Sequence, residues 1–183
     1  MGHGSRITSP RASQQGGPYR VTVGVTGGIA AYKACTLVRL LLKQGMDVTV
    51  VPTDAALKMV GRTTWEALTG KPVYTRTSEG AADVTHVAIG QHSDLIIVAP
   101  TTANTLAKVR AGIADNLLTS TILAARCPVI LAPAMHTEMW LNAATQDNVR
   151  VLRERGITVI DPAVGQLTGP DSGPGRLPEP EDL

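Results

Sequence analysis

The sequence predicts a single α/β domain of the Rossmann-like, flavodoxin-like type, in which helices cover both faces of an open parallel sheet. Three observations predict this fold. Short β-branched or aliphatic runs alternate with segments of helical periodicity. Two runs, 95–99 and 129–132, are apolar throughout, as is typical of strands that helices bury on both faces. Turns rich in Gly or polar residues separate these runs.

The elements follow in order along the chain. The expected strands are β-branched or aliphatic runs at 21–25, 47–51, 95–99, 129–132 and 157–160. The expected helices occupy 30–43, 54–60, 103–109, 114–125 and 137–155. Gly45 and Gly156 end the first and last of these helices, as glycine commonly does at a helix C-terminus. Thr53 is a residue type that caps helix N-termini, so it sets the start of the second helix.

Two segments of different composition flank the domain. Residues 1–19 are rich in Gly, Ser, Arg, Gln and Pro and show no periodicity, so we expect a flexible arm. Residues 161–183 contain four glycines and five prolines, which excludes a regular helix or a central strand and predicts a loop or an extended flap. The predicted organisation is therefore an arm over 1–19, a ligand-binding domain over 20–160 and a flap over 161–183.

Composition excludes several classes of function. The chain of 183 residues is 43% hydrophobic, so it can form a sizeable core. A net charge of +2 gives no electrostatic reason to expect a nucleic acid or an anionic membrane as partner. Two cysteines exclude a disulfide scaffold, and no His, Asp or Glu spacing indicates a metal site. No apolar run approaches the ~20 residues of a membrane helix and no signal peptide is visible, so we expect a cytoplasmic protein.

The segments that follow the strands carry the candidate site. Ligands bind at the carboxyl ends of strands in such sheets, which selects 26–30, 53–56, 99–104 and 133–140. The first segment, Thr-Gly-Gly-Ile-Ala, joins a strand to a helix and can approach a phosphate, although it lacks the G-x-G-x-x-G fingerprint. A tight turn without a ligand explains the same glycines equally well.

Two histidines are candidates for chemistry. His136 lies in the segment PAMHTEMW, straight after a buried strand, where a helix start is the alternative interpretation. His86 lies in a short apolar segment, where residue type alone favours a packed histidine over a catalytic one.

Five segments in order resemble those of the homo-oligomeric flavin-containing cysteine decarboxylases. They read GVTGGIAAYK at 24–33, THV at 85–87, APTTANT at 99–105, GIADNLLT at 112–119 and PAMHTEMW at 133–140. The resemblance extends over residues 21–182. It implies a carboxy-lyase that uses FMN to oxidise the cysteine side chain, so that the carboxylate can then leave as CO₂.

The resemblance also implies where ligands bind. FMN is expected at subunit interfaces of a trimer, or of a dodecamer built from trimers, and His86 is expected to be the catalytic base. The implied cofactor-binding residues are Gly27, Gly28, Ile29, Ala30, Thr53, Pro100, Thr102, Ala103, Asn104 and Asp115. The implied substrate-binding residues are Asn116, Met135, His136, Met139, Trp140 and Asp171.

Two departures from the family pattern bear on the substrate. Most members carry Asn at the position of His136, and an imidazole that donates a similar hydrogen bond is expected to retain activity with altered geometry. Members that make the coenzyme A precursor carry a flap cysteine, for which this chain has Gly169. The chain also ends after the flap, with no fused ligase domain. We therefore favour oxidative decarboxylation of the C-terminal cysteine of a precursor peptide, to an aminoenethiol, in the biosynthesis of a modified-peptide natural product.

Three alternatives remain. The first is phosphopantothenoylcysteine decarboxylation in coenzyme A biosynthesis, which the flap and the PAMHTEMW segment favour. The second is a non-catalytic flavin-binding regulatory subunit, against which His86 and the scarcity of acidic residues in the tail argue. The third is a flavin prenyltransferase, against which His86 and PAMHTEMW also argue.

Overall fold

The computed structural model describes residues 16–77, 85–166 and 172–183, and it confirms the predicted parallel α/β fold. Five parallel strands form the sheet, in the order β2-β1-β3-β4-β5. They are β1 (Arg20–Val25), β2 (Asp47–Pro52), β3 (Leu95–Thr101), β4 (Val129–Pro133) and β5 (Thr158–Val159). The chain builds outward from β1 in one direction and then from β3 in the other. This order therefore places a topological switch point between β1 and β3, where such sheets bind ligands.

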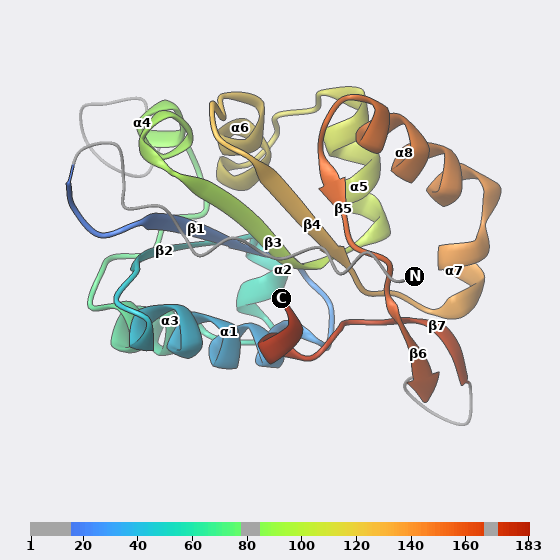
Figure 1. Cartoon of the computed structure of the whole chain (residues 1–183), viewed down its shortest axis with the longest axis horizontal. Helices are drawn as coiled ribbons and strands as arrows, with labels where there is room; N and C mark the ends of the chain where they lie inside the picture. The colour runs from blue at the N-terminus through green and yellow to red at the C-terminus, as the bar shows by residue number, and fades with distance from the viewer. Residues whose placement is uncertain (1–15, 78–84, 167–171) are drawn as a thin grey trace, which may run out of the picture.

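Helices cover the sheet on both faces (Figure 1). The helices are α1 (Ala31–Lys43), α2 (Asp54–Leu57), α3 (Arg62–Thr69), α4 (Thr85–His92), α5 (Ala103–Ala111), α6 (Leu117–Leu123), α7 (Thr137–Leu141) and α8 (Ala143–Glu154). Figure 1 shows α1 and α3 on one face and α4, α5, α6 and α8 on the other. Among the described helices, none is long and apolar enough to cross a bilayer.

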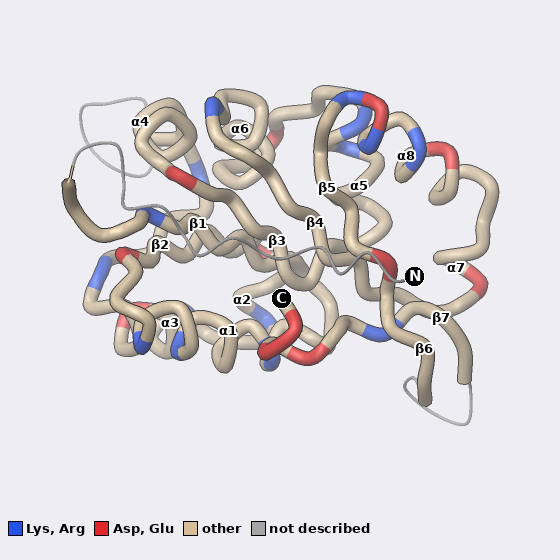
Figure 2. Tube along the Cα trace, in the orientation of Figure 1, with Lys and Arg blue, Asp and Glu red and all other residues tan. Residues whose placement is uncertain are grey.

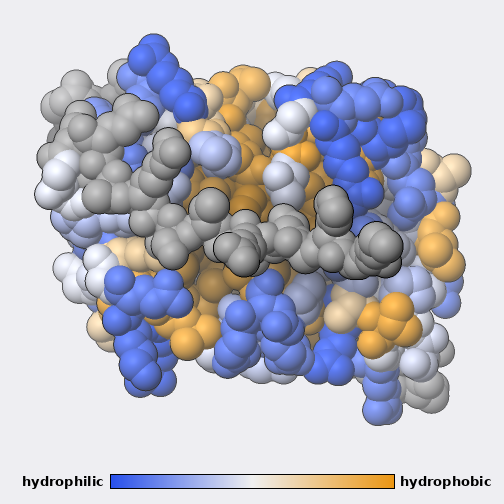
Figure 3. Space-filling model, viewed as in Figure 1, coloured by the Kyte–Doolittle hydropathy of each residue, from blue (hydrophilic) through white to orange (hydrophobic). Residues whose placement is uncertain are grey.

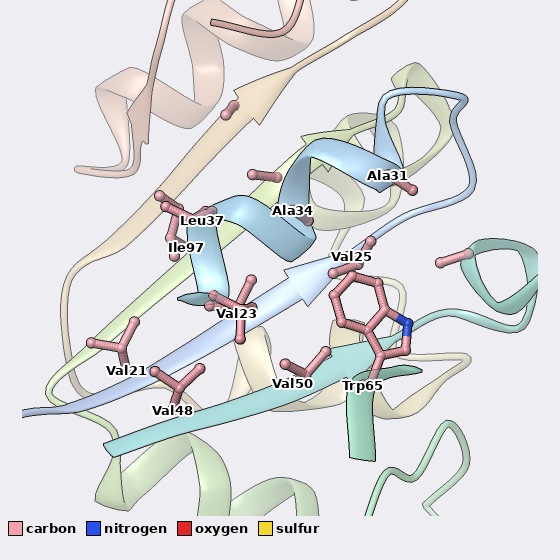
Figure 4. Packing of buried hydrophobic residues seen from close by; sticks show 14 of the residues in the cluster. Val21, Val23, Val25, Ala31, Ala34, Leu37, Val48, Val50, Trp65 and Ile97 are labelled. Carbon is pink, nitrogen blue, oxygen red and sulfur yellow. The ribbon is translucent and has the colours of Figure 1, made fainter. Parts of the chain in front are cut away.

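Each face of the sheet has its own hydrophobic core. On the first face, the valines of β1 together with Val48 and Val50 of β2 pack against α1 and against the fully buried Trp65 of α3 (Figure 4). On the second face, Leu106, Leu118 and Leu152 come from three different helices and pack against β3 and β4. Figure 3 shows apolar side chains gathered over the middle of the viewed face, with hydrophilic side chains around them. Aliphatic residues supply almost all of this core, as the near absence of aromatic residues requires.

Several boundaries differ from the prediction, and side-chain caps explain two of them. The helix expected from residue 114 begins at Leu117, because the Asn116 side chain accepts a hydrogen bond from the Thr119 N–H and caps it there. The helix expected over 137–155 is broken by Asn142, whose extended backbone and side chain start a new helix, α8. The helix expected over 54–60 ends at Leu57.

Two helices were not predicted. Helix α3 is only eight residues long and carries two large apolar side chains, Trp65 and Leu68, which are too few to form a repeating apolar pattern. Helix α4 buries only Gly90, and its apolar residues do not gather on one side.

The described residues after 160 are mainly extended. Strands β6 (Ala163–Gln166) and β7 (Ser172–Arg176) form an antiparallel hairpin that projects from the domain (Figure 1). A single 3₁₀ turn, η1 (Pro180–Asp182), follows it and packs near α1. The expected arm lies largely outside the described residues.

The Thr26 hydroxyl joins the two loops at the switch point. It is buried, donates a hydrogen bond to the Pro100 carbonyl at 2.8 Å and accepts one from the Thr102 N–H at 3.0 Å. The Thr26 N–H also donates to the Pro100 carbonyl, at 3.3 Å. The loop after β1 and the loop after β3 are therefore held in one arrangement by a side chain that uses both its donor and its acceptor.

Replacing this hydroxyl is expected to loosen the switch point. A T26V variant keeps the side-chain shape but leaves the Thr102 N–H without its partner, so we expect unfolding in urea to show a loss of roughly 1–3 kcal/mol. Amide hydrogen exchange should also accelerate at 27–30 and 100–103.

The matched control is T22V, because the buried Thr22 hydroxyl lies in the same strand and bonds the Ser93 hydroxyl at 2.7 Å at the other end of the sheet. We expect T22V to lower stability without faster exchange at those loops. Equal exchange in both variants would contradict the role assigned to Thr26.

Candidate active site

The loop after β1 lies close against a neighbouring helix. A side chain at Gly27 would overlap the Cβ of Ala55 in α2, so only glycine allows this approach. Directly after it, the N–H groups of Ile29 and Ala30 donate to no backbone carbonyl within the described residues. They precede α1, which has no acidic residue in its first turn and no side-chain cap. Free N–H groups at the positive end of a 13-residue helix favour an anion.

A cleft of about 610 Å³ opens at this loop. It lies between the start of α1, the start of α5, the loop after β4 and the flap. Its lining residues are Gly27, Gly28, Ile29, Ala30, Tyr32, Lys33, Thr102, Ala103, Ala134, Met135, His136, Met139, Gln166, Gly175, Arg176, Leu177 and Glu179. The volume falls in the range of small-molecule and cofactor sites.

Nine of the residues predicted to bind cofactor or substrate line this cleft. They are Gly27, Gly28, Ile29, Ala30, Thr102, Ala103, Met135, His136 and Met139. Pro100 lies just behind, since a Cβ on Gly28 would be 3.8 Å from its ring. These residues come from loops that lie up to 112 residues apart in the chain. Their convergence agrees with the rule that ligands bind at the carboxyl ends of strands.

Other predicted residues lie outside the cleft of the single chain. Thr53 caps α2 by accepting a hydrogen bond from the Ala56 N–H, and Asn116 caps α6. The Lys108 ammonium bonds Asp115 at 2.6 Å and lowers the pKa of that carboxyl. Trp140 is buried in the second core. These contacts give each residue a structural role, and their predicted part in binding stays a prediction.

Two further predicted residues also lie outside the cleft lining. Asn104 lies exposed on α5. Asp171 lies outside the described residues.

His86 lies in the first turn of α4 and is half-buried. Its Nδ1 atom is buried and has no hydrogen-bond partner in the described part of the chain. A buried polar atom without a partner is costly, and such atoms are rare in native structures. His86 is not among the residues that line the cleft of one chain. Its assignment as catalytic base therefore stays a prediction.

Sequence reasoning missed a charged cluster in the cleft. Lys33 Nζ donates to Glu179 Oε1 at 2.9 Å, and Arg176 donates to the same carboxylate oxygen. The hydrogen bond from Lys33, and then the one from Arg176, lowers the pKa of Glu179. Figure 2 shows charges of both signs where α1 and the C-terminal segment meet.

The sequence contained a signal for this cluster. Lys33 lies in the first turn of α1, directly after the segment 26–30 that the sequence selects as part of the site. Arg176 and Glu179 are the charged residues of the flap segment GPGRLPEP.

The flap closes one side of the cleft through backbone contact. The Met135 N–H donates to the Gly175 carbonyl at 2.9 Å. Gly175 has a φ of +150°, and a side chain there would overlap the Met135 carbonyl. The loop after β4 therefore lies directly against β7, which fixes the backbone beside His136.

These residues fit a flavin mononucleotide. The free N–H groups before α1 can hold a phosphate, and the apolar surfaces of Met135, Met139 and Leu177 suit a flat ring system. Thr102 adds a polar side chain at the opposite wall.

Known proteins share this architecture. The model of the flavoprotein family matches residues 9–183. The coenzyme A biosynthesis bifunctional protein CoaBC of Mycolicibacterium smegmatis is 60% identical over 164 residues, which are 90% of this chain and 40% of that protein. The chain thus spans about 40% of the length of this curated relative.

Two solved structures are similar over most of their length. A cysteine-to-serine mutant of PPC decarboxylase complexed with pantothenoylaminoethenethiol is 31% identical with a TM-score of 0.81, over 90% of this chain and 93% of that one. The FMN-dependent cysteine decarboxylase SpaF is 34% identical with a TM-score of 0.77, over 86% and 89%. The chain belongs to the flavoprotein family, within its group of FMN-dependent cysteine decarboxylases.

Proposed function

We propose that this chain removes the cysteine carboxylate of phosphopantothenoylcysteine as CO₂, with FMN as cofactor. The observation that carries the proposal is the 60% identity to a coenzyme A biosynthesis protein across 90% of the chain. This identity favours the alternative substrate over the C-terminal peptide cysteine that the sequence alone favoured. The cleft supports the proposal by combining an anion site, an apolar wall and charged groups in one cavity.

The reaction needs an electron sink next to the carboxylate. A bound FMN would supply this sink, because a flavin can oxidise the carbon that bears the thiol to a thiocarbonyl β to the carboxylate. In this proposal the N–H groups of Ile29 and Ala30 bind the FMN phosphate. Met135, Met139 and Leu177 exclude water from the ring, which strengthens the electrostatic interactions inside the cleft. Lys33 and Arg176 share the one carboxylate of Glu179, so the cluster keeps a net positive charge that attracts an anionic substrate.

His86 takes the thiol proton in this proposal. Its buried Nδ1 atom lacks a partner within the described residues, as a group that waits for a ligand or a second subunit would. Because His86 does not line the cleft of its own chain, we propose that the active site forms between copies of the chain in a homo-oligomer. Exposed apolar side chains at the cleft support this arrangement: Ile29 is 67% exposed and Tyr32 62%. A trimer, alone or within a dodecamer, is the assembly we propose.

The peptide substrate remains the second candidate. Gly169 stands where related coenzyme A enzymes have a cysteine, and it lies outside the described residues. The two candidate reactions give different products. Coenzyme A biosynthesis needs a saturated thiol, whereas the peptide pathway releases an unsaturated one.

Mass spectrometry of the products separates the two candidates. We expect the FMN-bound protein to convert phosphopantothenoylcysteine to a product lighter by CO₂ alone and to leave a cysteine-terminated peptide unchanged. A peptide product lighter by CO₂ and two hydrogens, with no reaction of phosphopantothenoylcysteine, would contradict the proposal and favour the peptide enzyme. No reaction with either substrate, in a protein that binds FMN, would favour a regulatory subunit.

Replacing His86 tests its role as the base. An H86N variant is expected to stay yellow with bound FMN and to lose decarboxylation by at least about 100-fold, the usual contribution of a general base. The control is H92N, because His92 is exposed at the other end of the same helix and bonds only the Ala88 carbonyl in the described residues. Full activity in H86N, or loss of its flavin, would refute the assignment.

A further inference from the structure

We propose that Gly90 positions the catalytic base: its contact with α6 sets where α4 lies, and α4 carries His86. This inference rests on the proposed function, in which His86 takes the thiol proton. It adds a positioning residue that lies outside the cleft lining and acts on the reaction through His86 alone.

At Gly90, α4 lies directly against the backbone of α6. Gly90 is buried, and the two helices lie side by side on the same face of the sheet (Figure 1). A Cβ at residue 90 would lie 2.7 Å from the Thr121 carbonyl oxygen and 3.1 Å from the carbonyl carbon of Ala124. Because these are backbone atoms, they cannot turn away as the end of a flexible side chain can. Only glycine therefore allows this contact.

Further hydrogen bonds hold the same end of α4. The Gly90 carbonyl accepts the Arg126 N–H at 3.3 Å, which joins the helix to the segment before β4. Ser93, directly after α4, donates its hydroxyl to the Ile89 carbonyl at 2.7 Å. The same hydroxyl bonds the Thr22 hydroxyl of β1, also at 2.7 Å. The C-terminal end of α4 is thus fixed to the sheet as well as to α6.

The position of the His86 side chain depends on this fixed end. His86 precedes Gly90 by four residues, so the two lie on the same face of α4, one turn apart. The His86 Nδ1 atom has no hydrogen-bond partner within the described residues, so no bond of that nitrogen holds the ring. Helix α4 has eight residues and is therefore only about 12 Å long. A displacement at Gly90 is consequently passed along the helix to His86.

The expected effect is large because proton transfer needs close alignment. A base acts within roughly 2.6–3.2 Å of its partner atom, and a misplacement of about 1 Å can cost about 100-fold in rate. A methyl group at residue 90 would have to lengthen the 2.7 Å separation to an ordinary contact of at least 3.4 Å. The shift imposed on α4 is therefore comparable to the misplacement that catalysis does not tolerate.

Single variants give the first test. With phosphopantothenoylcysteine at pH 7, we expect G90A to keep its FMN and its KM and to lose kcat by roughly 10–100-fold. S93A removes hydrogen bonds at the same end of α4 without adding an atom, so it should show a smaller loss of the same kind. The matched control is G61A, because a methyl group at Gly61 meets open space, and it should keep both constants.

The pH dependence separates a misplaced base from general damage. A cysteine thiol has an ordinary pKa of about 8.5, so raising the pH from about 7 to about 8.5 increases the thiolate form of the substrate more than about tenfold. A thiolate needs no base to remove its proton. The rates of G90A and H86N should therefore rise by about this factor, whereas those of the wild type and G61A should rise much less. A variant that is merely unstable would not recover in this way.

Double variants test whether Gly90 acts through His86. If it does, adding G90A or S93A to H86N costs nothing further, so both double variants should react at the H86N rate within about twofold at pH 7. Losses that multiply in the double variants would overturn the inference, and so would a wild-type kcat in G90A. If G90A does not fold, S93A and S93A/H86N decide by the same criteria.

The outcomes also separate this inference from the proposed function. A wild-type protein that leaves phosphopantothenoylcysteine unchanged, or an H86N variant with full activity, would refute the proposed function. An inactive H86N beside a fully active G90A would refute the positioning role alone.

Discussion

The arrangement of the site depends on the hydrogen bonds of one buried threonine. The Thr26 hydroxyl bonds both the Pro100 carbonyl and the Thr102 N–H, so it joins the two loops between which the strand order reverses. One of these loops carries the N–H groups that favour an anion, and the other carries the opposite wall of the cleft. The flap reaches the same place through the bond between Met135 and Gly175. Each contact involves only a few atoms, and together the contacts bring distant segments of the chain into one cavity.

The sequence predicted the sheet well, because buried parallel strands appear in a sequence as unbroken aliphatic runs. Nine of its candidate binding residues line one cleft, since parallel strands deliver the segments after them to one edge of the sheet. It failed where tertiary contacts determine where a helix forms or ends. Helix α3 is short and packs through Trp65 and Leu68, and a side-chain cap at Asn142 divides a helix whose apolar periodicity is continuous in the sequence. No short sequence pattern reveals these contacts.

The charged cluster in the cleft shows a second limit of prediction from sequence. Lys33 and Glu179 are separated by 146 residues, and only the folded flap brings them together. His86 shows the same limit, because the family resemblance implied a catalytic role for it while the single chain leaves it outside the cleft. The proposed site between subunits, which His86 would complete, has no counterpart in the sequence pattern of one chain. The substrate preference was also beyond local reasoning, since one glycine in the flap favoured the peptide, whereas similarity over the whole chain favours the coenzyme A precursor.

The central claim is that the cleft at the switch point holds the flavin, and amide hydrogen exchange with and without FMN tests it most directly. The account predicts that FMN slows exchange at 28–31, 102–103 and 134–136, most strongly at the Ile29 and Ala30 N–H groups. At the opposite edge, a shallow cavity lined in part by Arg20, Asp47 and His92 should show no change. Protection at that opposite edge, or FMN binding that leaves the N–H groups before α1 unprotected, would contradict the account.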